Sequence, residues 1–315
     1  MEGNKDQEAE VEHLHKNVTD QFSTLLSSPN EDTLSIAWLR NLLDVFLCCE
    51  SQFKDLLLTA SRDHTVSLDR LIPELIDRMV KSLDICNAVS DGVETLKNLQ
   101  RLARIAVSAL EQRPLGDGQV RRAKKALNSL VTSMMIEDNE RISSFKRKGN
   151  FPSLSSNVVA PRGGESSGLA LPVCMMSAVL VFVMWALVAA IPCQQRNGLG
   201  TLPRQWGWVQ PMIGFQEKIS KKKGSVGLLG EIHGLRKLGQ SLIEFADSFQ
   251  FPAEAGRLEE VKAQVEDLAQ ICRKMEEGLE PLQQQIREVF HRVLRSRSEF
   301  LHVLDQTAKL SMPAG

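Results

Sequence analysis

The feature that most constrains this chain is an uncharged apolar segment near its middle. No Asp, Glu, Lys or Arg occurs from Leu169 to Ile191. A helix over these residues is about 35 Å long at 1.5 Å per residue, which exceeds the roughly 30 Å of a bilayer's hydrocarbon core. The segment therefore either crosses a membrane or is surrounded by the rest of the chain.

The side chains of this segment favour the membrane interpretation. Leu, Ile, Val and Phe each lower the free energy of insertion, and no ionised group opposes them. Pro172 and Pro192 lie at the two ends, where neither interrupts the helix. The predicted membrane helix spans residues 169–192 and is defined by Val173, Val179, Leu180, Phe182, Trp185, Leu187 and Ile191. The alternative is a helix that is apolar all round and buried in the core of a soluble bundle.

The rest of the sequence predicts an all-α helical bundle. Apolar residues recur at steps of three and four in residues 1–140, and no stretch alternates with period two for long enough to form a sheet. We expect a helix break at Asp91 and Gly92. A Ser-, Gly- and Lys/Arg-rich linker is predicted at 141–168, and an irregular basic segment with tryptophans at 193–224.

A heptad pattern dominates the C-terminal helical region, residues 225–315. It runs from Leu258 to Val293, with Gly278 and Pro281 inside it, so we expect two helices in one phase rather than one long helix. Packing on the chain's own bundle is favoured over a coiled coil with another chain, which stays open.

Composition and motifs exclude several classes of function. The 38 Lys and Arg residues nearly balance 39 Asp and Glu residues, which argues against a nucleic-acid partner. The six cysteines show no metal-ligand or disulfide spacing, so we expect no metal, no cofactor and a reducing, cytoplasmic environment for the helical regions.

One sequence motif hints at catalysis. Residues Gly164 to Gly168 match G-x-S-x-G, the turn that holds the nucleophile in many serine hydrolases, with Ser166 as the candidate. That motif needs a strand before it and an α/β fold around it, and neither is predicted here. An enzyme is therefore the least favoured of the alternatives.

Five separate blocks of the sequence resemble the plant BYPASS and ROH-like family. They are residues 83–94, 104–127, 158–173, 179–194 and 278–299. The resemblance implies association with the exocyst, the complex that tethers secretory vesicles, and with developmental signalling. It also implies one membrane helix at Val173 to Ile191 and no catalytic residues. The middle linker of this chain is shorter than the resemblance leads us to expect.

Together these inferences predict a non-enzymatic, membrane-associated regulator of polarised secretion or plant development. Its membrane attachment is expected to be single-pass or peripheral, and its partner a helical protein such as an exocyst subunit. The partner surface is predicted at Trp38, Leu42 and Phe46 or on the heptad stripe, at Leu258, Val265, Leu282 and Val289. The alternative is a soluble helical scaffold in root-to-shoot signalling, with the apolar helix in its core.

Overall fold

The computed structural model describes residues 2–27, 34–60, 71–146, 169–193, 202–204, 206–221, 229–249 and 255–311. Within these ranges the chain is all-α, as predicted, and contains no β-strand. Its elements are α1 (Glu2–Leu26), α2 (Ile36–Ala60), α3 (Leu71–Leu110), α4 (Asp117–Lys146), α5 (Ala170–Ala190), the 3-10 helix η1 (Gly207–Val209), α6 (Gln210–Lys221), α7 (Gly230–Ser248) and α8 (Ala255–Ser311).

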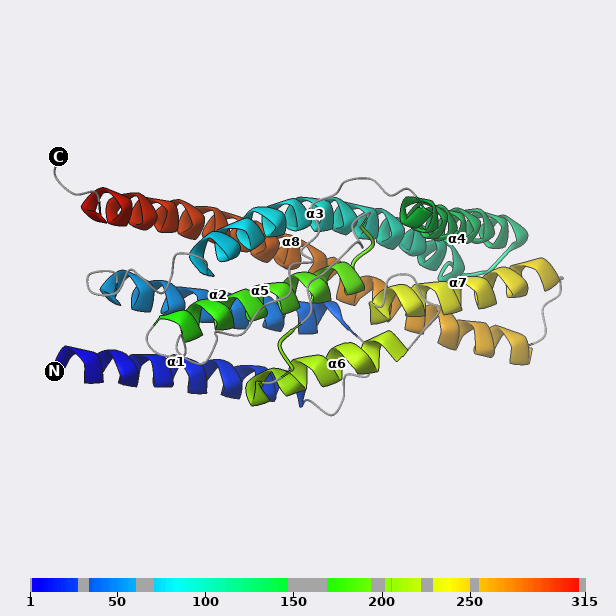
Figure 1. Ribbon diagram of the computed structural model, residues 1–315. Helices are drawn as coiled ribbons and strands as arrows, with labels where there is room; N and C mark the ends of the chain where they lie inside the picture. Colours follow the sequence, from blue (N-terminus) through cyan, green and yellow to red (C-terminus); the bar gives the residue numbers. More distant parts are fainter. Residues whose placement is uncertain are drawn as a thin grey trace.

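The helices form an elongated bundle that runs along the direction of α8 (Figure 1). The longest helix, α8, packs on α3, α2 and α7, while α4 packs on α3 and α7. The apolar helix α5 lies against α1, α2 and α3. The N-terminal end of α1 and the C-terminal end of α8 lie at the same end of the bundle (Figure 1).

The heptad region forms a single helix, so the predicted interruption at Gly278 and Pro281 is wrong. Pro281 lies inside α8, where it removes one backbone hydrogen bond. Apolar residues on both sides of it, including Leu279 and Leu282, are buried in the core, which holds the helix together across the proline. Gly278 allows close packing: a Cβ there would lie 2.6 Å from Cγ2 of Ile36 in α2.

The predicted break at Asp91 and Gly92 is also wrong, because α3 continues through both residues. Gly92 does not form a turn; it lets the residues that follow α5 pack closely on α3. A Cβ at this position would lie 2.1 Å from the carbonyl oxygen of Pro192, which follows α5. The missing side chain thus lets the end of α5 lie directly on α3.

The early and late parts of the sequence pack into the same bundle. Gly230 N–H donates to the carbonyl of Leu34 at 2.7 Å, and Ile36 N–H donates to the carboxylate of Glu231 at 3.2 Å. Glu231 therefore caps the first turn of α2 from the first turn of α7.

The predicted irregular segments also contain helix. Residues 193–224 include α6, and α4 extends to Lys146, into the predicted linker. Met212 and Ile219 are buried on one side of α6, which packs on α1. This packing stabilises a short helix that a sequence rich in Lys, Gly and Pro did not indicate.

Candidate functional site

The apolar helix α5 is a core helix in this structure. Nineteen of its 21 residues are buried, and only Leu171 and Trp185 are partly exposed. All of the predicted membrane residues apart from Trp185 lie in the hydrophobic core: Val173, Val179, Leu180, Phe182, Leu187 and Ile191. By length and composition α5 is long enough to cross a membrane, but its neighbours already shield it from water.

Helices from both halves of the sequence surround α5. Phe182 meets Phe22 of α1 edge to face at 5.9 Å between ring centroids, and Phe215 of α6 at 6.3 Å. Trp185 contacts the same Phe215 at 6.4 Å. The gap where α1, α2 and α5 meet has a volume of only about 10 Å³, near the lower limit for one water molecule. The packing around α5 is therefore tight.

A buried cation joins α3 to α5. Arg78 is 2% exposed, and its Nη1 donates to the hydroxyl of Ser177 at 3.4 Å. Its Nη2 donates to Glu74 at 3.4 Å on the same helix. A charged group in a core needs such partners, so this contact ties α5 to one position along α3.

Polar contacts also join α2 to α8. Glu50 is 1% exposed and accepts hydrogen bonds from the hydroxyl of Ser296 and from Nη1 of Arg292, the latter at 3.3 Å. Burial raises the pKa of Glu50, while the bond from Ser296 and the charge of Arg292 act in the opposite direction. One turn further on, Lys54 pairs with Glu299 at 2.8 Å.

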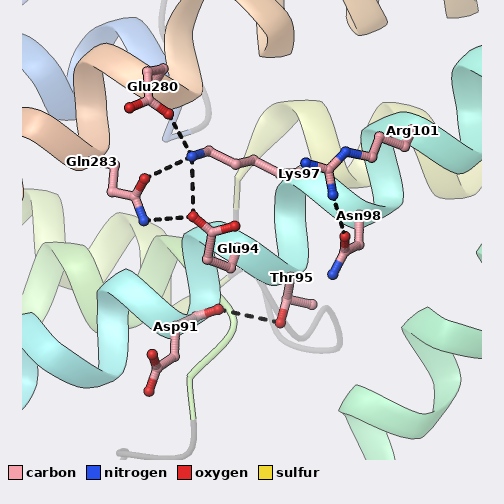
Figure 2. A network of polar contacts seen from close by, with 8 residues as sticks. All are labelled: Asp91, Glu94, Thr95, Lys97, Asn98, Arg101, Glu280 and Gln283. Carbon is pink, nitrogen blue, oxygen red and sulfur yellow. Dashed lines mark hydrogen bonds and ion pairs between the residues drawn. The ribbon is translucent and has the colours of Figure 1, made fainter.

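A second network joins α3 to α8 (Figure 2). Lys97 Nζ donates to Glu280 at 2.6 Å, to Gln283 at 2.7 Å and to Glu94 at 3.1 Å. Gln283 in turn donates to Glu94 at 2.8 Å, and this bond and the one from Lys97 lower the pKa of Glu94. Partial burial on its own would lower the pKa of Lys97. The bonds to Glu280 and Glu94 outweigh this effect, so the pKa is raised overall. The four side chains fix the register of the two helices.

The residues predicted to form a partner surface are not accessible in this structure. Trp38, Leu42 and Phe46 of α2 are buried, as are Val265, Leu282 and Val289 of α8. The side chain of Leu258 lies outside the described residues. A broad apolar stripe identifies a buried face without saying whether the chain's own helices or a partner cover it.

The large apolar side chains that do reach solvent lie elsewhere. Among the described residues they are Val80 and Ile105 of α3, Met135 and Ile136 of α4, and Leu294 and Leu301 of α8. Sequence periodicity missed them because each lies beside, rather than on, the apolar stripe of its helix. Met135 and Ile136, for example, directly follow Met134, which is the residue on the buried stripe.

Ser166 and its glycine-rich turn lie outside the described residues. In the part of the chain that is described, no group of His, Cys, Asp and Glu side chains is arranged to hold a metal ion. The polar clusters at Glu50 and Lys97 are instead contacts between helices.

Comparison with known proteins identifies relatives along nearly the whole chain. The family model described as "Protein ROH1-like" matches residues 1–153 and 150–304. Protein ROH1A of Arabidopsis thaliana is 42% identical over 98% of this chain and 93% of its own length. Protein ROH1D of the same plant is 36% identical over 93% of this chain and 88% of its own length. No solved structure matches.

The alignment with ROH1A also shows a difference in length. It runs over 387 positions for ROH1A, more than the 315 residues of this chain, so ROH1A has residues that this chain lacks. The two parts of the family match meet at residues 150–153, inside the predicted linker.

Proposed function

This chain belongs to the ROH1-like family of plants, and from that premise we propose that it is a regulatory scaffold that acts by binding another protein. The burial of α5 is the observation that carries the proposal. With α5 as a core helix, the chain is a rigid bundle whose function lies in its outer surface. The polar networks at Glu50 and Lys97 support this, because they hold the outer helices α2, α3 and α8 in one arrangement.

Solubility tests the role of α5. A bundle with α5 inside it is expected to leave a plant membrane fraction in high salt or alkaline carbonate, and to be purified from a heterologous host without detergent. A chain that carbonate leaves in the membrane, and that only detergent releases, would contradict the scaffold with a buried α5. That outcome would favour a second candidate, a protein anchored by α5, which the length and composition of this helix allow.

The partner that the family resemblance suggests is a subunit of the exocyst, and we include it in the proposal. Because the predicted surface at Trp38 and Val265 is buried, we assign the contact to the exposed side of α8, where Leu294 and Leu301 reach solvent. These two residues are seven apart and so lie on the same side of the helix. A helical partner with apolar residues at matching spacing fits such a stripe.

Co-precipitation from plant extract tests this assignment. The intact chain is expected to bring down exocyst subunits, and Leu294→Asp with Leu301→Asp is expected to reduce the yield about tenfold or more. A matched control, Val80→Asp on α3, changes a side chain of the same exposure, 39% for both Val80 and Leu294. Capture that is absent for the intact chain would exclude the exocyst, and equal loss in the control would exclude the α8 surface.

A further inference from the structure

The outer side of α4 carries an unusual run of positive charge. From Gly118 to Ile136 the sequence contains Arg121, Arg122, Lys124 and Lys125 and no acidic residue. Arg121 pairs with Asp117, and Lys124 pairs with Asp247 of α7. Within the described residues, Arg122 and Lys125 are exposed and form no ion pair. The chain is nearly neutral overall, so this charge is a local property of α4.

Two exposed apolar residues lie further along α4. Met135 is 56% exposed and Ile136 is 52% exposed, the highest values among the large apolar side chains that are described. They are adjacent in the sequence and follow a polar stretch with Asn128, Ser129 and Thr132. Acidic residues return at Glu137. The stripe from Arg121 to Ile136 is therefore basic at one end and apolar at the other.

Helical spacing places these residues along one surface. Positions 121, 125, 128, 132 and 136 are separated by three or four residues and so lie in one row, with Arg122 and Met135 to either side of it. A shallow, open groove of about 620 Å³ follows this row, and its described lining consists of cationic, hydroxyl and amide side chains, among them Lys125, Ser129 and Thr132. Such groups can donate hydrogen bonds to anionic oxygens, and none of them carries a negative charge.

We propose that this face of α4 binds the surface of an anionic lipid bilayer. A helix that lies on a membrane combines Lys and Arg, which attract anionic headgroups, with apolar side chains that enter the boundary of the acyl chains. Arg122 and Lys125 supply the first property, and Met135 and Ile136 supply the second. A soluble acidic protein would also be attracted by the charge, but the two adjacent exposed apolar side chains favour the bilayer.

This mode of attachment leaves α5 inside the bundle. It makes the chain a peripheral protein of anionic membranes, without a spanning helix and without unfolding of the core. It also does not depend on the partner proposed for α8, because α4 and the exposed side of α8 carry different residues. Failure of one proposal therefore leaves the other standing.

Co-sedimentation of the full chain with lipid vesicles tests the proposal. We expect binding to vesicles of phosphatidylcholine with phosphatidylserine, little binding to phosphatidylcholine alone, and release by salt. Arg122→Glu with Lys125→Glu is expected to weaken binding about tenfold or more, since each cation near such a surface contributes measurably. Met135→Ser with Ile136→Ser is expected to weaken it by about tenfold as well, because two inserted side chains are lost.

A matched variant on α8 controls for these changes. Leu294→Ser with Arg295→Glu removes one exposed apolar residue and reverses one exposed cation, and it is expected to leave vesicle binding within about twofold of the intact chain. Circular dichroism verifies that all variants remain folded. Binding that is insensitive to the α4 changes, or equally sensitive to the α8 control, would overturn the proposal. Binding to soluble heparin without binding to vesicles would also overturn it and assign the face to a soluble acidic partner.

Discussion

The guanidinium group of Arg78 and the hydroxyl of Ser177 lie 3.4 Å apart inside the bundle. Ser177 is the only hydroxyl-bearing residue of α5, and Arg78 is one of the few buried charged side chains among the described residues. The polar group of the apolar helix therefore meets a buried cation of α3. This pairing makes the position of α5 specific, because a shift of α5 along α3 would leave the guanidinium without that partner.

The first prediction concerns this contact. Ser177→Ala is expected to lower the free energy of unfolding by about 0.5–1.5 kcal/mol through the lost hydrogen bond. Arg78→Ala is expected to lower it by about 2–4 kcal/mol, because the packed stem of the side chain is lost as well. The double variant is expected to lose less than the sum, since both changes remove one interaction. Urea denaturation followed by circular dichroism measures all three.

A control for the Arg78 variant is Arg122→Ala, which changes an exposed cation and is expected to alter stability by less than about 0.5 kcal/mol. If Arg78→Ala were no more destabilising than this control, Arg78 would not be part of the core.

The second prediction concerns Gly92. Gly92→Ala places a Cβ 2.1 Å from the backbone oxygen of Pro192 and 2.8 Å from Cγ2 of Ile191, so α5 has to move away from α3. We expect a loss of about 2–4 kcal/mol in the free energy of unfolding, in spite of the better helix propensity of Ala. Gly214→Ala in α6 meets nothing within 4 Å and is expected to stabilise by about 0.5–1 kcal/mol. A neutral or stabilising Gly92→Ala would contradict the contact between α3 and the end of α5.

The third prediction concerns pH and Glu50. Its pKa is raised in the folded state, so over the pH range above the ordinary value of 4.5 the folded protein binds more protons at this group than the unfolded protein does. The contribution of Glu50 to stability therefore decreases as the pH rises through that range. Glu50→Gln removes the ionisable group, and the stability of this variant relative to the intact chain is expected to increase with pH from about 4.5 upward.

Glu94→Gln serves as the contrasting variant. The pKa of Glu94 is lowered, so its contribution is present at neutral pH and is lost as the pH falls, and the variant should show the opposite trend. Urea denaturation at a series of pH values provides the measurement. The same pH trend in both variants would show that Glu50 does not titrate as a buried group.

The fourth prediction concerns thiol reactivity. Cys48 is exposed, whereas Cys49, Cys86, Cys174, Cys193 and Cys272 are buried. Burial raises the pKa of the Cys49 and Cys86 thiols to about 12 and that of Cys272 to about 11, so these groups stay protonated and react slowly at neutral pH. We expect one rapid equivalent in a titration of the native protein with a disulfide reagent, and none after Cys48→Ser. Rapid modification of a second cysteine would indicate that the bundle opens.

The helices and their buried sides could be predicted, because both follow from the spacing of apolar residues along a single helix. Apolar residues at steps of three and four identified the helices and their buried sides, as for Leu127 and Leu130 of α4 or Leu282 and Val289 of α8. Gly92, Gly278 and Pro281 were misjudged, because in isolation such residues weaken a helix. Here the neighbouring helices stabilise α3 and α8 through those positions, and the two glycines allow the close contacts with Pro192 and Ile36.

The candidate sites were less predictable for a related reason. Trp38, Leu42 and Phe46 were assigned to a partner from their periodicity, but periodicity does not distinguish a partner's surface from the chain's own core. The exposed side of α4 was overlooked because its signal lies in which residues remain uncovered, and that depends on how α3 and α7 pack on α4.

The sequence by itself determined that the chain is helical and that the segment from Leu169 to Ile191 has to be kept from water, because both properties depend on the order of side chains alone. Only the tertiary structure shows that the chain's own helices can enclose this segment. The free energy of burying α5 is favourable in either environment, so the outcome depends on whether α1, α2, α3 and α6 together present enough apolar surface, and a buried partner for Ser177, to enclose it.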